Sequence, residues 1–279
     1  MNVTFFGTTT LLFDDGKDAL MFDGHFTRPS FLRYVMGTME TDTAMADSIL
    51  ERFDFSRLRG IFVSHTHHDH VMDVPYIANH CHADIFGTES AANVARGGQV
   101  PEEQIHVFDP SRPVTVGDFT VTVIPSIHSE PTIINNDLGQ TIDEPLVQPA
   151  RKKHYKEGGS YDFLIRHGGQ TILIRPSFNY LEGQLDDIRA DLLFLGIGTM
   201  GKASEEKIRN FYRETIDKVQ PRTVVPIHWD NFFSPLDRPI RDMLRIADNT
   251  RRAMDHVARY CGERDIEFIV QYPLIRLRF

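Results

Sequence analysis

Short apolar runs alternate along this chain with segments whose apolar residues recur at helical spacing. In the first half, apolar runs surround the DDGKD turn at 14–18, and further runs lie at 59–64, near Ile85, near Ile105 and at 119–124. The second half repeats this pattern with DFLIRH, TILIR, DLLFL and TVVPIH, and then ends with EFIVQY. Apolar runs of about four to eight residues are typical of strands buried in a sheet, so each run predicts a strand.

Three segments between these runs predict helices. Residues 73–80 carry apolar residues at helical spacing directly after the strand at 59–64. Ser204 is a suitable N-cap for a second helix, with two glutamates in its first turn and an apolar face that ends before Pro221. A third helix is expected over 239–261, because proline suits a helix start and the glycine that follows suits a helix end.

Strands and helices mixed in this order indicate an α/β fold in which two sheets pack face to face and helices cover both outer faces. No linker rich in Pro, Gly or Ser divides the chain, so residues 1–279 are expected to form a single domain. The segment from His25 to Phe55 goes beyond a minimal fold. Its apolar residues are expected to pack on the core as a peripheral helix, or alternatively to cover a substrate site or form a homo-oligomer contact.

The stretch GIFVSHTHHDHVMDVP, residues 60–75, contains four candidate metal ligands within six positions. They are His65, His67, Asp69 and His70, and they directly follow the predicted strand at 59–64. Imidazole nitrogens and carboxylate oxygens are donors that zinc accepts, and iron and manganese accept them as well. Thirteen histidines in 279 residues make some close neighbours unsurprising, but the position at a strand's carboxyl end is where α/β sheets place their sites.

Two further histidines stand at the ends of later apolar runs. His128 ends FTVTVIPSIH, and His228 ends TVVPIH. Each run is rich in β-branched residues and predicts a strand that would present its histidine at a sheet edge. Taken singly, each would more often be a structural histidine. Beside the first motif, both become candidate metal ligands.

This constellation resembles the metallo-β-lactamase-fold hydrolases, whose signature HxHxDH is matched by residues 65–70. The resemblance implies an α/β architecture, the four-layer αββα sandwich of the metallo-β-lactamase fold. It also implies two metal sites, the first formed by His65, His67 and His128 and the second by Asp69, His70 and His228. The order of elements and the PIHWD ending are most similar to the branch that contains the ascorbate-phosphate lactonases and related lipid phosphodiesterases.

One position departs from the family pattern. Family members usually carry an aspartate after a mid-chain strand, where its carboxylate bridges two metals, but this chain reads TILIRPSFNY there. Ser177 is expected in the place of that aspartate, with Asn179 two residues on, and neither is an anionic bridge at neutral pH. Two metals with a weaker second site, or one metal alone, both stay open. Asp23 is a candidate to orient a ligand imidazole, or else a turn aspartate at a strand end.

A divalent metal in this ligand set implies hydrolysis by activated water. Zinc is expected first, with manganese and iron as alternatives, because nitrogen and oxygen ligands accept all three. Such an ion lowers the pKa of bound water from about 16 toward about 7, which yields a hydroxide nucleophile at neutral pH. Asp69 is then expected to be a catalytic residue, both a ligand and a proton carrier. The expected reaction is hydrolysis of a small anionic ester, either a lactone or a phosphodiester.

Two other functions stay open at this stage. One is redox chemistry at a single iron on the same fold, in which His70 and His228 would lack a clear role. The other is a metal-binding or sensing module with little turnover, which the absence of the bridging carboxylate at Ser177 would explain.

The composition and the net charge indicate which classes of partner and which cellular location to expect. A formal net charge of −9 argues against a nucleic-acid partner. The basic cluster at 151–154 is either a solvated loop or a source of cations for an anionic substrate. No run reaches the roughly 18 apolar residues of a membrane span, and the N-terminus lacks a signal-peptide pattern, so a cytoplasmic location without membrane contact is expected. Cys81 and Cys261 are expected to be ordinary thiols.

Overall fold

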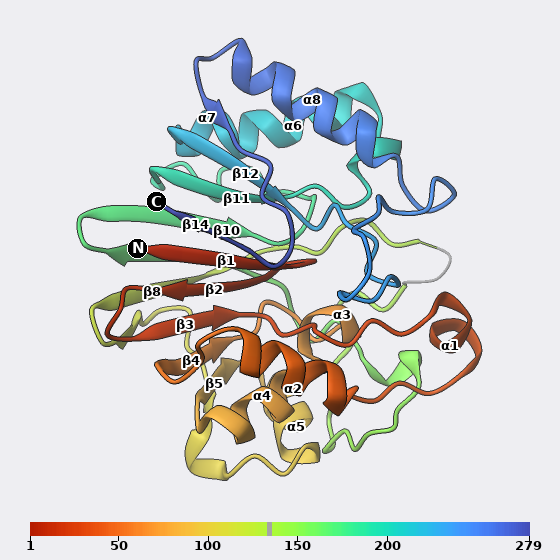
Figure 1. Ribbon diagram of the computed structural model, residues 1–279. Coiled ribbons are helices and arrows are strands. Elements are labelled where there is room, and N and C mark those ends of the chain that lie inside the picture. The colour runs from red at the N-terminus through yellow and green to blue at the C-terminus, as the bar shows by residue number, and fades with distance from the viewer. Residues whose placement is uncertain (133–135) are drawn as a thin grey trace.

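Two mixed β-sheets packed face to face form the centre of the computed structural model, which describes residues 1–132 and 136–279 (Figure 1). The strands of the first sheet are β1 (Asn2–Gly7), β2 (Thr10–Asp14), β3 (Ala19–Phe22), β4 (Leu58–Phe62), β5 (Asp84–Gly87), β6 (Ile105–Val107) and β14 (Ile275–Arg278). Their order across the sheet is β14-β1-β2-β3-β4-β5-β6.

The second sheet has the order β13-β12-β11-β10-β9-β8-β7. Its strands are β7 (Val114–Val116), β8 (Phe119–Pro125), β9 (Tyr161–His167), β10 (Gln170–Arg175), β11 (Leu192–Gly196), β12 (Thr223–Ile227) and β13 (Glu267–Phe268). The two sheets share one plan, since β3 to β6 are parallel neighbours in the first and β10 to β13 are parallel neighbours in the second. The carboxyl ends of parallel strands meet at one edge, which is where such sheets place their sites.

Helices cover both outer faces of this pair of sheets (Figure 1). On the first sheet lie α2 (Thr43–Arg52), α4 (Val74–Cys81) and α5 (Glu89–Gly97), and on the second lie α6 (Glu205–Glu214), α7 (Ile216–Val219) and α8 (Thr250–Gly262). Two short helices, α1 (Phe31–Met36) and α3 (His68–Val71), flank the edge that carries the histidine motif. The αββα sandwich expected from the sequence is therefore confirmed. None of the helices in the described ranges has the length and apolarity needed to cross a membrane.

Alternating burial explains why the strands read as continuous apolar runs. In β1, Phe5 packs into the core between the sheets, while the next residue, Phe6, packs against the helices outside. The same alternation separates Phe13 from Leu12 in β2 and puts Met21 of β3 on the outer side. Because neighbouring side chains of a strand point to opposite faces, a sheet covered on both sides needs apolar residues at nearly every position.

The predicted helix ends are confirmed in one case and wrong in another. The Ser204 side chain accepts a hydrogen bond from the backbone N–H of Lys207 and caps α6 as expected. The last helix, however, begins at Thr250 instead of Pro239. Residues 239–249 form a loop instead, in which Asp242 makes an isolated antiparallel bridge with Asp230 and residues 245–247 form a turn.

The C-terminal strand prediction also needs correction. The run EFIVQY forms only the two-residue strand β13, and its later residues leave the second sheet. The chain then returns as β14 and pairs antiparallel with β1 at the edge of the first sheet, so the two chain ends lie close together (Figure 1). No apolar run in the sequence predicted this strand, because most of its side chains are exposed.

A buried ion pair ties the start of the chain to the segment after β12. Arg28 Nη2 lies 2.7 Å from Asp230 Oδ2, and both side chains are almost fully buried. The other oxygen of Asp230 accepts the backbone N–H of Thr8 at 2.8 Å, and Arg28 donates to the carbonyl of Phe6 at 3.1 Å. Gly7 lies against this pair with a φ of +94°, and a Cβ there would overlap the Arg28 guanidinium. The pair therefore fixes the backbone next to His228.

Removing one member of this pair should strongly destabilise the fold. We expect Asp230→Ala to lower the free energy of unfolding by about 3–5 kcal/mol, because the Arg28 charge would stay buried without its partner. Asp118→Ala removes an exposed partner of Lys17 and should leave the free energy of unfolding almost unaltered. Denaturant unfolding followed by circular dichroism measures both values, and equal losses in the two variants would contradict this expectation.

Candidate metal centre

The six candidate ligands come from three chain segments that meet at one edge of the sandwich. The histidine motif, residues 65–70, follows β4 and runs into α3, so that Asp69 and His70 lie on the first helical turn. His128 follows β8, and His228 follows β12. His228 has a φ of +57°, and its backbone N–H donates to the carbonyl of Thr8 at 2.5 Å. Segments far apart in the sequence are thus brought together by the strands that carry them.

The first ligand group contains His65, His67 and His128, whose ligand atoms all lie within 4.8 Å of one another. Their ring centroids are 4.6 to 4.9 Å apart. Nδ1 of His128 lies 2.9 Å from the backbone carbonyl of Ser129. A carbonyl only accepts hydrogen bonds, so Nδ1 carries the proton and Nε2 is the nitrogen that His128 offers to a metal.

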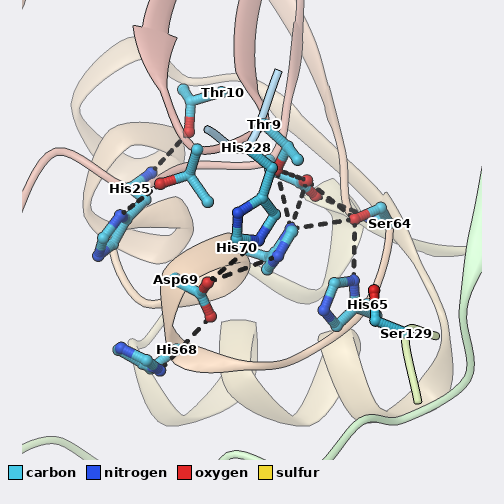
Figure 2. A network of polar contacts seen from close by, with 12 residues as sticks. Thr9, Thr10, His25, Ser64, His65, His68, Asp69, His70, Ser129 and His228 are labelled. Carbon is cyan, nitrogen blue, oxygen red and sulfur yellow. Dashed lines mark hydrogen bonds and ion pairs between the residues drawn. The ribbon is translucent and has the colours of Figure 1, made fainter. Parts of the chain in front are cut away.

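The second group contains Asp69, His70 and His228. Asp69 Oδ2 lies 3.5 Å from His228 Nε2 and 3.8 Å from His70 Nε2 (Figure 2). Bonds of about 2.0–2.1 Å in a tetrahedral zinc site place neighbouring ligand atoms about 3.3 Å apart. The separations here are close to that value. The two groups are adjacent, since the ring centroids of His65 and His70 are 3.7 Å apart.

Asp23, which follows β3, lies behind the second group. Its Oδ2 is 2.7 Å from His70 Nδ1, and because a carboxylate only accepts, Nδ1 of His70 carries the proton. Ser64 donates to the same carboxylate from its backbone N–H at 2.7 Å and from Oγ at 2.8 Å, and the Thr9 hydroxyl also donates to it. The structure thus places Asp23 where it orients His70 and leaves Nε2 of that ring for a metal.

The burial of unpartnered nitrogens fits a bound cation. Among the described residues, Nε2 of His65 and Nε2 of His70 are buried and have no hydrogen-bond partner. Figure 2 shows Ser64 beside these two rings, with its hydroxyl near the Nδ1 atom of each. A buried polar atom without a partner costs free energy, and a metal ion satisfies a neutral imidazole nitrogen. The donor set of imidazoles and one carboxylate suits zinc, iron or manganese.

Burial keeps the imidazoles of the first group ready for a metal. It lowers the pKa of His65 well below the usual value and that of His128 to about 3, so both rings are neutral at pH 7. Burial alone would raise the pKa of Asp69, but His70, His68 and His228 hold it well below its usual value. Neutral imidazoles and an ionised carboxylate are the forms that bind metals.

Ser177 and Asn179 lie after β10, as the sequence suggested. Ser177 is buried, and its carbonyl accepts the backbone N–H of Asn179. The side-chain amide of Asn179 donates to the carbonyl of His128 at 2.7 Å, so Asn179 supports a ligand candidate from behind. The segment that would carry a bridging aspartate therefore supplies neutral groups only.

Three residues near the centre were not identified as candidates from the sequence: His25, His68 and Asp137. His68 and His25 are buried neighbours of the motif. Tyr34, from the segment considered as a possible substrate cover, has its ring 4.8 Å from that of His68. Asp137 lies with its carboxylate oxygens 3.2 and 3.3 Å from His67 Nε2. His68 lies inside the motif, at the second of its two unspecified positions, which is why it was not identified as a candidate. Asp137 is seventy positions away in an aperiodic segment, where local pattern carries no signal.

Comparisons with known proteins agree with this architecture. A family model described as a beta-lactamase superfamily domain matches residues 46–229. No sequence among curated proteins gives a significant match.

Solved structures of low sequence identity share the fold. The metallo-beta-lactamase fold protein YhfI from Bacillus subtilis is 15% identical with a TM-score of 0.58, covering 99% of each chain. A metallo hydrolase from the archaeon Ignicoccus hospitalis is 15% identical with a TM-score of 0.60, covering 100% of this chain and 98% of that one. The diiron beta-hydroxylase CmlA from Streptomyces venezuelae is 13% identical with a TM-score of 0.63, covering 100% of this chain and 54% of that one.

Replacement of Asp23 tests its role behind His70. We expect Asp23→Asn to weaken zinc binding by about 10- to 100-fold, because an amide no longer fixes the protonated Nδ1 of His70 as a carboxylate does. Competition with a chromophoric zinc chelator measures the change. Asp118→Asn, at an exposed ion pair, is the matched control and should leave the affinity unaltered. Equal affinities in the Asp23 variant and the native protein would count against this role.

Proposed function

This chain belongs to the beta-lactamase superfamily, and we propose that it is a metal-dependent hydrolase of small anionic esters that works with two divalent metal ions. The observation that carries the proposal is the adjacency of the two ligand groups, with buried Nε2 atoms of His65 and His70 on neighbouring rings. We propose zinc as the metal, held first by His65, His67 and His128 and second by Asp69, His70 and His228.

The chain's own residues would position the reacting groups and move protons between them. When bound, the metals supply Lewis acidity and lower the pKa of water from about 16 toward about 7. Asp69 is ionised and lies within 4 Å of both His70 and His228, so its carboxylate can orient a water and accept its proton. The same carboxylate can then return that proton to the leaving group. Asp23 keeps the proton on Nδ1 of His70 and so preserves the ligand geometry during turnover.

The charge of the centre supports an anionic substrate. The two ligand groups contain five imidazoles and a single carboxylate, so two dications held there would keep a net positive charge. An aspartate at Ser177 would reduce that charge, but the chain has none at this position. A carboxylate or phosphate group of the substrate can take the place of that missing anion.

The surroundings of the motif offer a cation and an aromatic wall for such a substrate. Lys152 Nζ lies 5.1 Å from the centre of the Tyr34 ring, and burial lowers the pKa of this ammonium group. Phe232 contacts the rings of both His68 and His228. A small ester with one anionic end and an apolar body fits these groups, which supports our proposal of a lactone or phosphodiester substrate and of a place near the lactonase-like branch.

Iron-based redox chemistry is the alternative that the fold keeps open, since one structure of this fold is a diiron beta-hydroxylase. A mononuclear iron would leave the second ligand group without a role. Two zinc ions or two irons would occupy both groups, so oxygen uptake by the iron-loaded protein separates hydrolysis from redox chemistry.

Metal content and hydrolysis together test the proposal. We expect about two zinc ions per chain and measurable turnover of a lactone or a phosphodiester by the loaded protein. His65→Ala should lose at least one ion and reduce turnover by at least about 100-fold, because it removes a first-group ligand. His80→Ala, on the exposed end of α4, is the control. Elemental analysis and a substrate panel give both readouts. Oxygen uptake by an iron-loaded protein without any hydrolysis would overturn the proposal.

Placing a carboxylate at position 177 tests whether the absence of an anionic ligand weakens the second zinc site. We expect Ser177→Asp to bind the second zinc more tightly, by at least about tenfold, because an anionic ligand adds Coulomb attraction to a buried dication. Calorimetric titration with zinc measures the second affinity, and Ser129→Asp is a same-charge comparison at a neighbouring position of the centre. An unchanged second affinity would show that Ser177 does not occupy the bridging position.

A further inference from the structure

The segment between β8 and β9 is fastened to the histidine motif by its described residues. The backbone N–H of Thr66 donates to the carbonyl of Glu157 at 2.8 Å. The Glu157 side chain is buried and accepts the backbone N–H of Gly139 at 2.6 Å, and the N–H of Gly158 donates to the carbonyl of Gln140 at 2.9 Å. These bonds hold the turn around residues 137–140 against the motif.

Asp137 stands at the start of this turn, and its carboxylate faces His67. Its oxygens lie 3.2 and 3.3 Å from His67 Nε2, and its side chain is only 16% exposed. The backbone carbonyl of Asp137 also accepts the N–H of Gln140 at 3.0 Å, which fixes the residue from its own side. The contact is therefore made by a carboxylate whose backbone is anchored.

We propose that Asp137 is a positioning residue of the first metal site, an inference that rests on the proposed metal centre. Its carboxylate accepts the Nε2 proton of His67, so this ring presents Nδ1 to the metal. A carboxylate behind a ligand histidine fixes its tautomer and orientation and makes it a stronger donor. The ligand cluster itself consists of the three histidines and, within the described residues, does not include Asp137. Asp137 thus acts through His67.

The second site has the matching arrangement with the opposite ring nitrogen. There Asp23 holds Nδ1 of His70, and Nε2 faces the metal. One histidine in each group is therefore backed by a carboxylate, which comes from the end of β3 in one case and from the connecting segment in the other. Asp137 also brings a negative charge close to the centre that Ser177 does not provide.

The state of the His67 ring in the zinc-loaded protein tests this inference directly. Nitrogen-15 NMR of labelled histidine distinguishes a protonated ring nitrogen from a metal-bound one. We expect His67 to carry a proton on Nε2 and zinc on Nδ1. Zinc on Nε2 would overturn the inference, since Asp137 would then be a ligand or a bystander. The measurement needs only the native protein and a His67→Gln variant for assignment.

Zinc affinity gives a second readout that does not depend on turnover. We expect Asp137→Asn to weaken one of the zinc affinities by about 10- to 100-fold, and Asp137→Glu to recover part of the loss. Glu144→Gln removes the same charge from an exposed position of the same segment and should change neither affinity by more than about twofold. Native affinity in Asp137→Asn would overturn this inference alone. A native protein that binds no zinc would overturn the proposed function as well.

Discussion

The carboxylate of Asp23 is the contact on which the arrangement of the metal centre depends. It is almost fully buried and accepts hydrogen bonds from Ser64, from Thr9 and from His70. These donors lie directly before the histidine motif, in the turn between β1 and β2, and in α3. A buried carboxylate is stable only when its oxygens are satisfied, so the three segments must converge on it. The position of His70 follows from that convergence.

The charge balance of the centre sets what it can bind. Burial keeps His65 and His128 neutral, and only Asp69 in the two ligand groups is anionic. Ser177 adds no charge, whereas Asp137 adds one beside His67. Two cations in this setting would be short of negative charge, which is the reason why we propose an anionic substrate. The same shortage of negative charge is a reason for the role that we propose for the Asp137 carboxylate, which comes from the segment between β8 and β9.

Elements with buried side chains were predicted correctly from the sequence, whereas elements with mostly exposed side chains were missed. Apolar runs located the buried strands, and Ser204 marked the start of α6 because N-capping is a local interaction. The loop before Thr250 was missed, since its path depends on backbone contacts, such as the one between Asn231 and Arg241, that no local pattern encodes. The strand β14 was missed for a similar reason, because its side chains are mostly exposed and its partner is β1 at the other end of the chain.

The sequence by itself indicated the class of the fold and the ligand candidates, through strand periodicity, the HxHxDH spacing and the resemblance to the metallo-β-lactamase-fold hydrolases, all of which are read from local stretches of the chain. Tertiary structure alone decided which nitrogen three of the ligand histidines offer, since that choice depends on the group behind the ring: Asp23 behind His70, Ser129 behind His128 and Asp137 behind His67. It also decided that Tyr34 and Phe232 line the motif. Such contacts join distant segments, and their geometry exists only after the two sheets have packed together.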